Sequence, residues 1–219
     1  MKSLVISPHP DDEVLGAGGT LFKRKSLKKN LLYWIIVTKL KSSSSKKRIL
    51  ERNNEIKKIS KLFGFKKVFQ LNFNTTELDN SSKKKLIQDF SDIFNKIKPN
   101  ELFVPHFSDV HSDHKIVSEV ISSSTKNFRF PYIKKILAYE VLSETDYNLN
   151  RKQIFFPNYY EDITKFLTKK KNAMKIYKSE IKKFPFPRSI KTIDALARLR
   201  GSQIGKSAAE SFEILREIN

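Results

Sequence analysis

Histidine and aspartate side chains gather at two places in this sequence. The stretch "SPHPDDE" near the start of the chain carries His9, followed by Asp11 and Asp12. About a hundred residues later, "PHFSDVHSDH" holds the three remaining histidines, His106, His111 and His114. Imidazole and carboxylate groups without thiols match a common catalytic zinc site, in which two histidines and one carboxylate leave a position open for water. The two stretches predict a metal site if the fold brings them together.

The spacing of these residues suggests how their roles divide. His9 and Asp12 lie three residues apart at a predicted strand-to-helix turn, so both side chains can face one ion, with His111 or His114 as the third ligand. A second carboxylate that does not bind the metal is needed as a general base. The adjacent pair Asp11 and Asp12 can supply one base and one ligand, because neighbouring side chains on a turn point in different directions.

Each stretch also has a simpler interpretation when it is taken alone. Asp11 or Asp12 could cap the following helix, whose N-terminal dipole favours acidic side chains. The glycines of "GAGG" at 16–19 could form a phosphate loop, but the chain lacks the Lys-Ser/Thr of a P-loop and the G-x-G-x-x-G spacing of a dinucleotide site there. We expect these glycines to allow close helix packing. "HSDH" alone could be a surface turn, so it is the combination that favours a metal site.

Apolar runs and amphipathic segments alternate over the first 142 residues. The pattern predicts strands at 3–7, 31–38, 66–73, 101–107 and 134–142, and helices at 12–28, 45–65, 82–99 and 112–124. Strands separated by helices imply βαβ units, and right-handed crossovers give a mostly parallel, Rossmann-like three-layer α/β sandwich. In strand order 3-2-1-4-5 the first and fourth strands are neighbours at the point where the chain reverses direction, which is where such sheets bind ligands. This order would join the two histidine stretches.

The C-terminal part, residues 143–219, has a different pattern. We expect a short strand near "QIFFP" (153–157), a lysine-rich helix at about 162–183 and another helix at about 190–200. These elements would form an appendage that packs on the Rossmann-like core of residues 1–142. The whole chain, residues 1–219, is therefore predicted to be one domain.

The composition limits the classes of function. The net charge is +20, but 34 of the 43 basic residues are lysines, which are spread through nearly every segment. Specific nucleic-acid contacts favour arginine, so we do not expect a nucleic-acid partner and attribute the lysines to compositional bias. Binding of anionic glycans, nucleotides or membrane surfaces is the alternative. The chain has no cysteine and no apolar run of ~18 residues, and we expect a cytoplasmic protein without a membrane span.

These motifs resemble those of the PIG-L/LmbE family of zinc-dependent N-acetylglucosaminyl deacetylases. That family has a (P/A)HPDDE motif after its first strand and an HxDH motif after a later one, which correspond here to "PHPDDE" (8–13) and "HSDH" (111–114). "RILERNNEIKKISKLFGF" resembles the R-x-x-E helix of the family. "AYEVLSET", "FFPNYYEDI", "FPFPRS" and "LARLRGSQIGKSAAESF" resemble a bacterial branch of it. The likeness extends over nearly the whole chain.

The resemblance implies a role for each motif residue. His9, Asp12 and His114 would bind zinc, and Asp11 would be the general base. His111 would be an imidazolium that stabilises the oxyanion or protonates the leaving amine. Asp113 would hold the His111 ring by a hydrogen bond and so raise its pKa. Other divalent transition metals suit the same ligands, and the candidate substrate-binding residues are Arg52, His106 and Arg188.

The implied reaction is hydrolysis of the N-acetyl group of an N-acetylated amino sugar, such as an N-acetylglucosamine-type glycoconjugate, with release of acetate. The product would enter the synthesis of surface glycans, glycolipids or small thiols. Two alternatives stay open: an amidase for another acylated conjugate, and a basic binding protein with a structural metal site. The C-terminal helices suggest a homo-oligomer.

Overall fold

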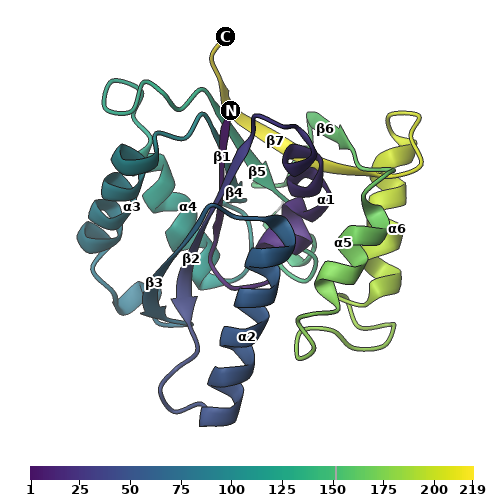
Figure 1. The fold of residues 1–219 in the computed structure, drawn as a ribbon, viewed down its shortest axis with the longest axis horizontal. Helices are drawn as coiled ribbons and strands as arrows, with labels where there is room; N and C mark the ends of the chain where they lie inside the picture. Colours follow the sequence, from purple (N-terminus) through teal and green to yellow (C-terminus); the bar gives the residue numbers. More distant parts are fainter. Residues whose placement is uncertain (151) are drawn as a thin grey trace.

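The computed structural model describes residues 1–150 and 152–219, which form a seven-stranded sheet with helices on both faces (Figure 1). The strand order is β3-β2-β1-β4-β5-β7-β6. The neighbours from β3 to β5 pair in parallel, whereas β7 is antiparallel to both β5 and β6. This confirms the predicted order 3-2-1-4-5. The strands are β1 (Lys2–Ser7), β2 (Leu31–Lys39), β3 (Lys67–Asn74), β4 (Glu101–Pro105), β5 (Lys135–Tyr139), β6 (Tyr159–Asp162) and β7 (Ala209–Glu217).

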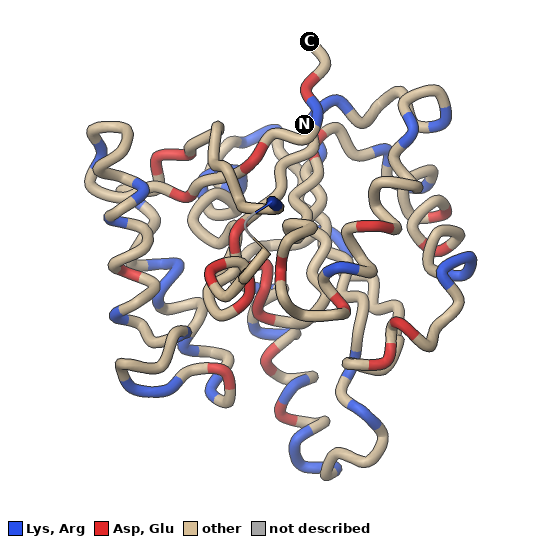
Figure 2. The backbone as a smooth tube through the Cα atoms, turned by 180° about the vertical axis from the view of Figure 1, so that it is seen from behind, with Lys and Arg blue, Asp and Glu red and all other residues tan. Residues whose placement is uncertain are grey.

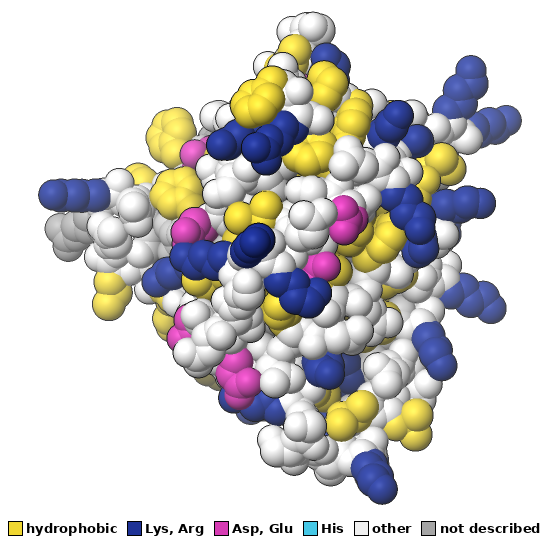
Figure 3. Space-filling model, turned by 90° about the vertical axis from the view of Figure 1, so that its left-hand side faces the viewer, with side chains coloured by type: hydrophobic (Ala, Val, Ile, Leu, Met, Phe, Trp, Pro, Cys, Tyr) yellow, Lys and Arg dark blue, Asp and Glu magenta, His cyan; other side chains and the backbone are white. Residues whose placement is uncertain are grey.

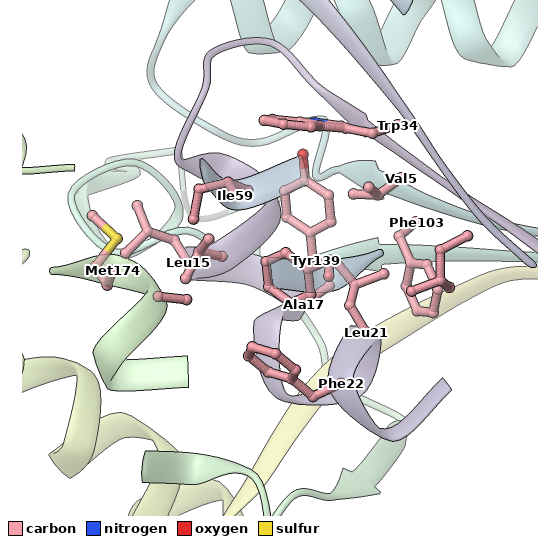
Figure 4. Close-up of a cluster of buried hydrophobic side chains, with 14 of the residues drawn as sticks. Val5, Leu15, Ala17, Leu21, Phe22, Trp34, Ile59, Phe103, Tyr139 and Met174 are labelled. Carbon is pink, nitrogen blue, oxygen red and sulfur yellow. The ribbon is translucent and has the colours of Figure 1, made fainter. Parts of the chain in front are cut away.

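Both faces of the sheet are buried, so its central strands are almost continuously apolar. Leu4 and Ile6 of β1 face the core under α3 and α4, while Val5 between them faces the core under α1 and α2. In this second core Tyr139 lies close to Ala17 and Trp34 (Figure 4). The helices are α1 (Asp12–Ser26), α2 (Lys46–Phe63), α3 (Lys83–Ile97), α4 (Ser112–Ser124), α5 (Leu167–Met174) and α6 (Ile190–Ser202), with short 3-10 turns at Leu78–Asn80 and Thr145–Tyr147.

Local signals set the ends of α2. The Ser45 side chain accepts a hydrogen bond from the backbone N–H of Arg48 and caps the first turn. Gly64 ends the helix with φ 71°, a left-handed conformation that costs glycine little. The helix predicted at 45–65 therefore ends at Phe63, two residues before its predicted end.

The glycines of "GAGG" let α1 approach the sheet and its C-terminal extension. A Cβ on Gly16 would overlap the Tyr139 ring, and one on Gly19 would lie 2.7 Å from the Ile163 side chain. Both neighbouring side chains are fully buried, and the Tyr139 hydroxyl donates a hydrogen bond to the Ile6 carbonyl at 2.8 Å. The expectation that these glycines allow close packing is confirmed.

Gly16→Ala is expected to lower the free energy of unfolding by ~1–3 kcal/mol, the usual cost of overpacking a core. Helix propensity alone would raise it by about 1 kcal/mol, so the two effects differ in sign. Urea unfolding of the variant measures the outcome. Gly18→Ala is the matched control, because its Cβ would meet the Lys170 and Val14 side chains at 3.3 Å, a contact that a small shift relieves. If Gly16→Ala were more stable than the wild type, the Tyr139 contact would not be what requires glycine.

The C-terminal part differs from the prediction in three places. The strand expected at 153–157 is wrong: β6 begins at Tyr159, after Pro157, which has no N–H to donate to a ladder. The helix expected at 162–183 is also wrong beyond α5, because the chain turns after Met174 and buries Tyr177 under α1. Strand β7 was not predicted, since Glu210 interrupts its apolar pattern. The Glu210 carboxylate is paired in the fold, with Lys170 Nζ at 2.6 Å.

The basic residues that the structure describes do not gather on one face. Lys and Arg are distributed over all parts of the chain trace (Figure 2), and Figure 3 shows their side chains dispersed across the face at the left of Figure 1. Within residues 1–150 and 152–219, no helix is both long and apolar enough to cross a membrane.

Candidate active site

The two histidine stretches meet at the carboxyl edge of the sheet. β1 leads into the turn that carries His9, Asp11 and Asp12, and β4, which pairs with β1, leads towards α4 with His111 and His114. A cavity of about 230 Å³ opens there, and all five of these residues line it. The turn after β1 and the segment after β4 thus form one site because the two strands pair with each other, as the strand order predicts.

Three side chains form a triangle that fits a metal ion. His114 Nε2 lies 3.3 Å from both Asp12 Oδ2 and His9 Nδ1, and His9 Nδ1 lies 3.7 Å from Asp12 Oδ2. Bonds of ~2.0–2.2 Å to a tetrahedral zinc ion require ligand atoms roughly 3.3–3.6 Å apart. The structure therefore brings together the predicted ligands His9, Asp12 and His114 with suitable atoms and spacing.

The carboxylates around this triangle stabilise positive charge within it. Burial opposes ionisation of Asp12, but the charge and hydrogen bond of His114 lower the pKa of Asp12 to about 2. Burial likewise disfavours a charged His114, yet Asp12 and Asp109 raise the pKa of His114 well above its usual value. A divalent cation placed between these groups would meet the same negative potential.

The far side of each predicted histidine ligand is held by a further carboxylate. His114 Nδ1 lies 2.8 Å from Asp109 Oδ2, and His9 Nε2 lies 2.9 Å from Asp113 Oδ2. Such pairs fix the orientation of a ligating imidazole and raise its basicity. Asp109 was missed in the sequence, although it lies only five residues before His114. It is fully buried and also accepts a hydrogen bond from the Thr145 hydroxyl at 2.6 Å.

Asp109→Asn is expected to weaken metal binding by ~10–100-fold, the usual effect of losing an outer-sphere partner. The amide keeps the shape of the side chain but removes the charge that supports His114. Titration of the apoprotein with Zn²⁺ against a chelator measures the affinity. Asp92→Asn, on the exposed side of α3, is the control and should leave the affinity unchanged. An unchanged affinity for Asp109→Asn would show that the His114 ring is positioned by packing alone.

The structure corrects the predicted roles of Asp113 and His111. The Asp113 carboxylate contacts His9 rather than His111, and it also accepts a hydrogen bond from the Thr76 N–H at 2.8 Å. His111 caps α4: its Nδ1 accepts a hydrogen bond from the backbone N–H of Asp113 at 3.1 Å. Burial and the neighbouring His9 and His114 rings lower the pKa of His111 to about 4. The acceptor role of Nδ1 and this lowered pKa both favour the neutral ring with its proton on Nε2, rather than the imidazolium that the resemblance implies.

Asp11 adopts an unusual backbone conformation, with φ 142° and ψ −26°. Although it occupies the cap position of α1, its side chain makes no capping hydrogen bond, and its Oδ2 lies 3.2 Å from Arg188 NH1. The simpler interpretation of Asp11 as a helix cap is thus wrong. Burial and the adjacent Asp12 raise the pKa of Asp11 well above its ordinary value, against the effect of Arg188.

Glu13 braces this turn from behind. Its carboxyl group accepts hydrogen bonds from the Asp11 N–H at 3.1 Å and from the Tyr177 hydroxyl at 2.7 Å. Burial raises the pKa of Glu13 to about 8. Backbone strain of ~1–3 kcal/mol persists only where the surroundings enforce it, and these contacts hold Asp11 in place beside the triangle.

The predicted substrate-binding residues separate into two groups. Arg52 and Arg188 line the cavity. His106 is fully buried instead, with Nδ1 at 2.6 Å from the Ser108 hydroxyl and Nε2 at 3.1 Å from Glu213. It is not among the described residues that line the cavity, and its contacts are those of a structural histidine.

Glu180 joins the two arginines and was not predicted from the sequence. Its Oε1 accepts a hydrogen bond from Arg52 NH2, and its Oε2 lies 3.5 Å from Arg188 NH1. Arg52 NH1 in turn donates to the carbonyl of Pro10. No spacing in the sequence relates Glu180 to the histidine motifs, because it reaches the cavity from the irregular segment between α5 and α6. The network ties that segment to the turn that carries Asp11.

Comparison with known proteins shows the family of the chain. Residues 4–124, more than half of the chain, match the PIG-L family, which is described as GlcNAc-PI de-N-acetylase. The diacetylchitobiose deacetylase of Thermococcus kodakarensis is 25% identical over 193 residues, which cover 82% of this chain and 70% of that protein. The uncharacterized deacetylase YaiS of Escherichia coli is 26% identical over 182 residues, covering 80% and 90% of the two chains.

A solved structure shares the fold. The N,N'-diacetylchitobiose deacetylase of Pyrococcus horikoshii superposes with a TM-score of 0.76 at 24% identity, over 98% of this chain and 84% of that one. Fold, motifs and family match define the class of protein: a hydrolytic N-deacetylase. The chain belongs to the PIG-L family.

Proposed function

We propose that this protein uses a zinc ion to remove the acetyl group from an N-acetylated amino sugar of the N-acetylglucosamine type, with release of acetate. The observation that carries the proposal is the triangle of His9, Asp12 and His114 with the buried carboxylate of Asp11 beside it in one cavity. The diacetylchitobiose deacetylase from Thermococcus kodakarensis supports an amino-sugar substrate. Zinc is favoured by the mixed imidazole and carboxylate ligands, although iron or cobalt suits the same set.

A divalent cation in the triangle supplies Lewis acidity, which polarises a carbonyl group and makes water more acidic. The residues of the chain do the rest. Because Arg188 engages Oδ2 of Asp11, Oδ1 is the atom that can take a proton from the attacking water. As the C–O bond forms, the carbonyl oxygen gains negative charge, which the Nε2–H of neutral His111 can stabilise by a hydrogen bond. When the C–N bond breaks, Asp11 returns the proton to the amine nitrogen, and acetate and the free amino sugar result.

The test is hydrolysis by the zinc-loaded protein. N-acetylglucosamine and N,N'-diacetylchitobiose are supplied, and both free amine and acetate are measured. Equal amounts of the two products are expected, with the zinc-loaded Asp11→Asn variant as the blank. If neither product rises above this blank for any N-acetylated amino sugar, the proposed substrate class is wrong.

A further inference from the structure

Glu180 gathers three guanidinium groups at the edge of the active-site cavity. Its Oε1 accepts hydrogen bonds from Arg52 NH2 and, at 3.1 Å, from Arg48 NH2, while its Oε2 lies 3.5 Å from Arg188 NH1. Burial opposes ionisation of Glu180, but a hydrogen bond from Ser179 and the charges of two of the arginines lower the pKa of Glu180. The carboxylate is therefore charged, and it attracts all three arginines at once.

The fold fixes the place of Glu180 relative to the active-site turn. The segment between α5 and α6 lies beside α2 (Figure 1), and the N–H of Glu180 donates a hydrogen bond to the Tyr177 carbonyl at 3.0 Å. Tyr177 is fully buried, and its hydroxyl donates to Glu13 at 2.7 Å. Glu13 also accepts a hydrogen bond from the N–H of Asp11. Because Glu13 contacts both segments, it positions Asp11 and Glu180 relative to each other.

Arg188 is shared between two carboxylates. Its NH1 lies 3.2 Å from Asp11 Oδ2 and 3.5 Å from Glu180 Oε2. An arginine beside a single carboxylate often contacts both of its oxygens through two parallel hydrogen bonds, but here one nitrogen contacts one oxygen of Asp11. Arg188 Nε is buried and has no hydrogen-bond partner among the described residues, which costs free energy. Closer pairing with Asp11 would relieve that cost, and the attraction of Glu180 for NH1 opposes it.

The second oxygen of Asp11 is the one that the proposed reaction needs. Asp11 lines the cavity, and its Oδ1 accepts no hydrogen bond from a residue that the structure describes. If the charge of Glu180 were absent, the Arg188 guanidinium would be free to turn and to donate to both oxygens of Asp11. A carboxylate that accepts additional hydrogen bonds in its charged form holds a proton less well, so Asp11 would be a poorer base.

We propose that Glu180 is a positioning residue for the deacetylation reaction: by attracting Arg188, it limits this arginine to one oxygen of Asp11 and keeps Oδ1 free for the attacking water. The inference rests on the proposed function, in which Asp11 is the general base. In this role Glu180 acts through Arg188 and needs no contact with the substrate. Its removal should therefore lower kcat and leave KM nearly unchanged.

Steady-state kinetics of the Glu180→Gln variant test this role. The amide keeps the shape of the side chain but removes its charge, so kcat is expected to fall at least about tenfold, though by less than the ~10²–10⁴-fold that a general base contributes. Glu180→Asp keeps the charge on a shorter side chain and should have an intermediate kcat. Zinc content and circular dichroism of each variant check that the metal site and the fold are intact.

Glu55→Gln is the matched control. Glu55 pairs with Arg52 at 3.3 Å and with Arg48 at 3.6 Å, so it shares two arginines with Glu180. None of the ion pairs among the described residues joins it to Arg188. Its replacement should leave kcat nearly unchanged. A fall in kcat as large as that of Glu180→Gln would show that the effect comes from Arg48 or Arg52, and would overturn the proposal.

An Arg188→Gln background separates positioning from a general structural effect. Because Glu180 acts through Arg188, Glu180→Gln should lower kcat in the wild type but cause no further change in Arg188→Gln. An equal fall in both backgrounds would overturn the proposal. A rise in KM at constant kcat would overturn it as well, because Glu180 would then be a substrate contact.

A crystal structure of the Glu180→Gln variant keeps this inference distinct from the proposed function. Arg188 is expected within hydrogen-bond distance of both Asp11 oxygens in that structure. If Arg188 contacts Oδ2 alone, the proposal is wrong, whatever the assay shows. If Arg188 contacts both oxygens but the wild type releases no acetate from any N-acetylated amino sugar, the proposed function is wrong, whereas the control of Arg188 by Glu180 is confirmed.

Discussion

The Asp11→Asn variant is expected to bind metal with unchanged affinity and to lose ~10²–10⁴-fold in kcat, the usual contribution of a general base. Asparagine keeps the shape of the side chain, and its amide oxygen can still accept a hydrogen bond from Arg188, which lies 3.2 Å from Asp11 Oδ2. What it cannot do is take the proton of the attacking water. Amine release under saturating substrate measures kcat, and metal content is measured on the same sample.

A second carboxylate in the cavity provides the control for this assignment. Glu144 also lines the cavity, and burial raises its pKa. It follows β5 rather than β1, and it lies outside the triangle of ligand atoms that Asp11 adjoins. Glu144→Gln should therefore affect kcat far less than Asp11→Asn. If the sizes of the two effects were reversed, Glu144 would be the base and Asp11 a structural partner of Arg188.

The elements that position the site were readable from the sequence because they depend on local patterns. Apolar runs gave β1 and β4, and their alternation with helices gave a parallel sheet whose order makes these two strands neighbours. The strand order alone then brings the turn after β1 and the start of α4 together, irrespective of the side chains that they carry. This is why His9, Asp12 and His114 could be predicted as a group from positions about a hundred residues apart.

Hydrogen-bond partners within the site could not be predicted in the same way. Asp113 lies two residues from His111, yet its carboxylate contacts His9, because α4 directs it back towards β1. Spacing fixes the region that a side chain reaches but not which of several rings it contacts there. Glu180 was missed for a related reason: it lies in an irregular segment, which carries no periodicity from which its position could be inferred.

In the C-terminal part of the chain, tertiary contacts override the local structural preferences of the sequence. The lysine-rich stretch after Met174 has a helical composition but turns, and Tyr177 then donates a hydrogen bond to Glu13 under the active-site turn. Glu210 would be expected on a surface. In β7 it is buried and accepts hydrogen bonds from the backbone N–H groups of Gly19 and Thr20 at 2.8 and 2.7 Å. Such pairings are a property of the folded chain and leave no local pattern.

Removal of a predicted ligand should have the largest effect on metal binding. Asp12→Ala and His114→Ala are each expected to lower Zn²⁺ affinity by more than the ~10–100-fold that loss of an outer partner such as Asp109 causes. The physical reason is geometric: either change leaves only two of the three atoms that lie 3.3–3.7 Å apart. Chelator competition gives the affinities, and circular dichroism of each apoprotein checks folding.

The order of the four variants is the decisive result. Affinity should be unchanged in Asp11→Asn, reduced in Asp109→Asn and lowest in Asp12→Ala and His114→Ala. Turnover should follow a different order, because Asp11→Asn loses it with the metal in place. If Asp12→Ala kept one tightly bound zinc ion per chain, the ion would have to bind elsewhere. One such place is between His9, His111 and Asp113, whose ligand atoms also lie within 4.8 Å of one another. Asp113→Ala would then lose the metal, whereas in the proposed site it only weakens the support of His9.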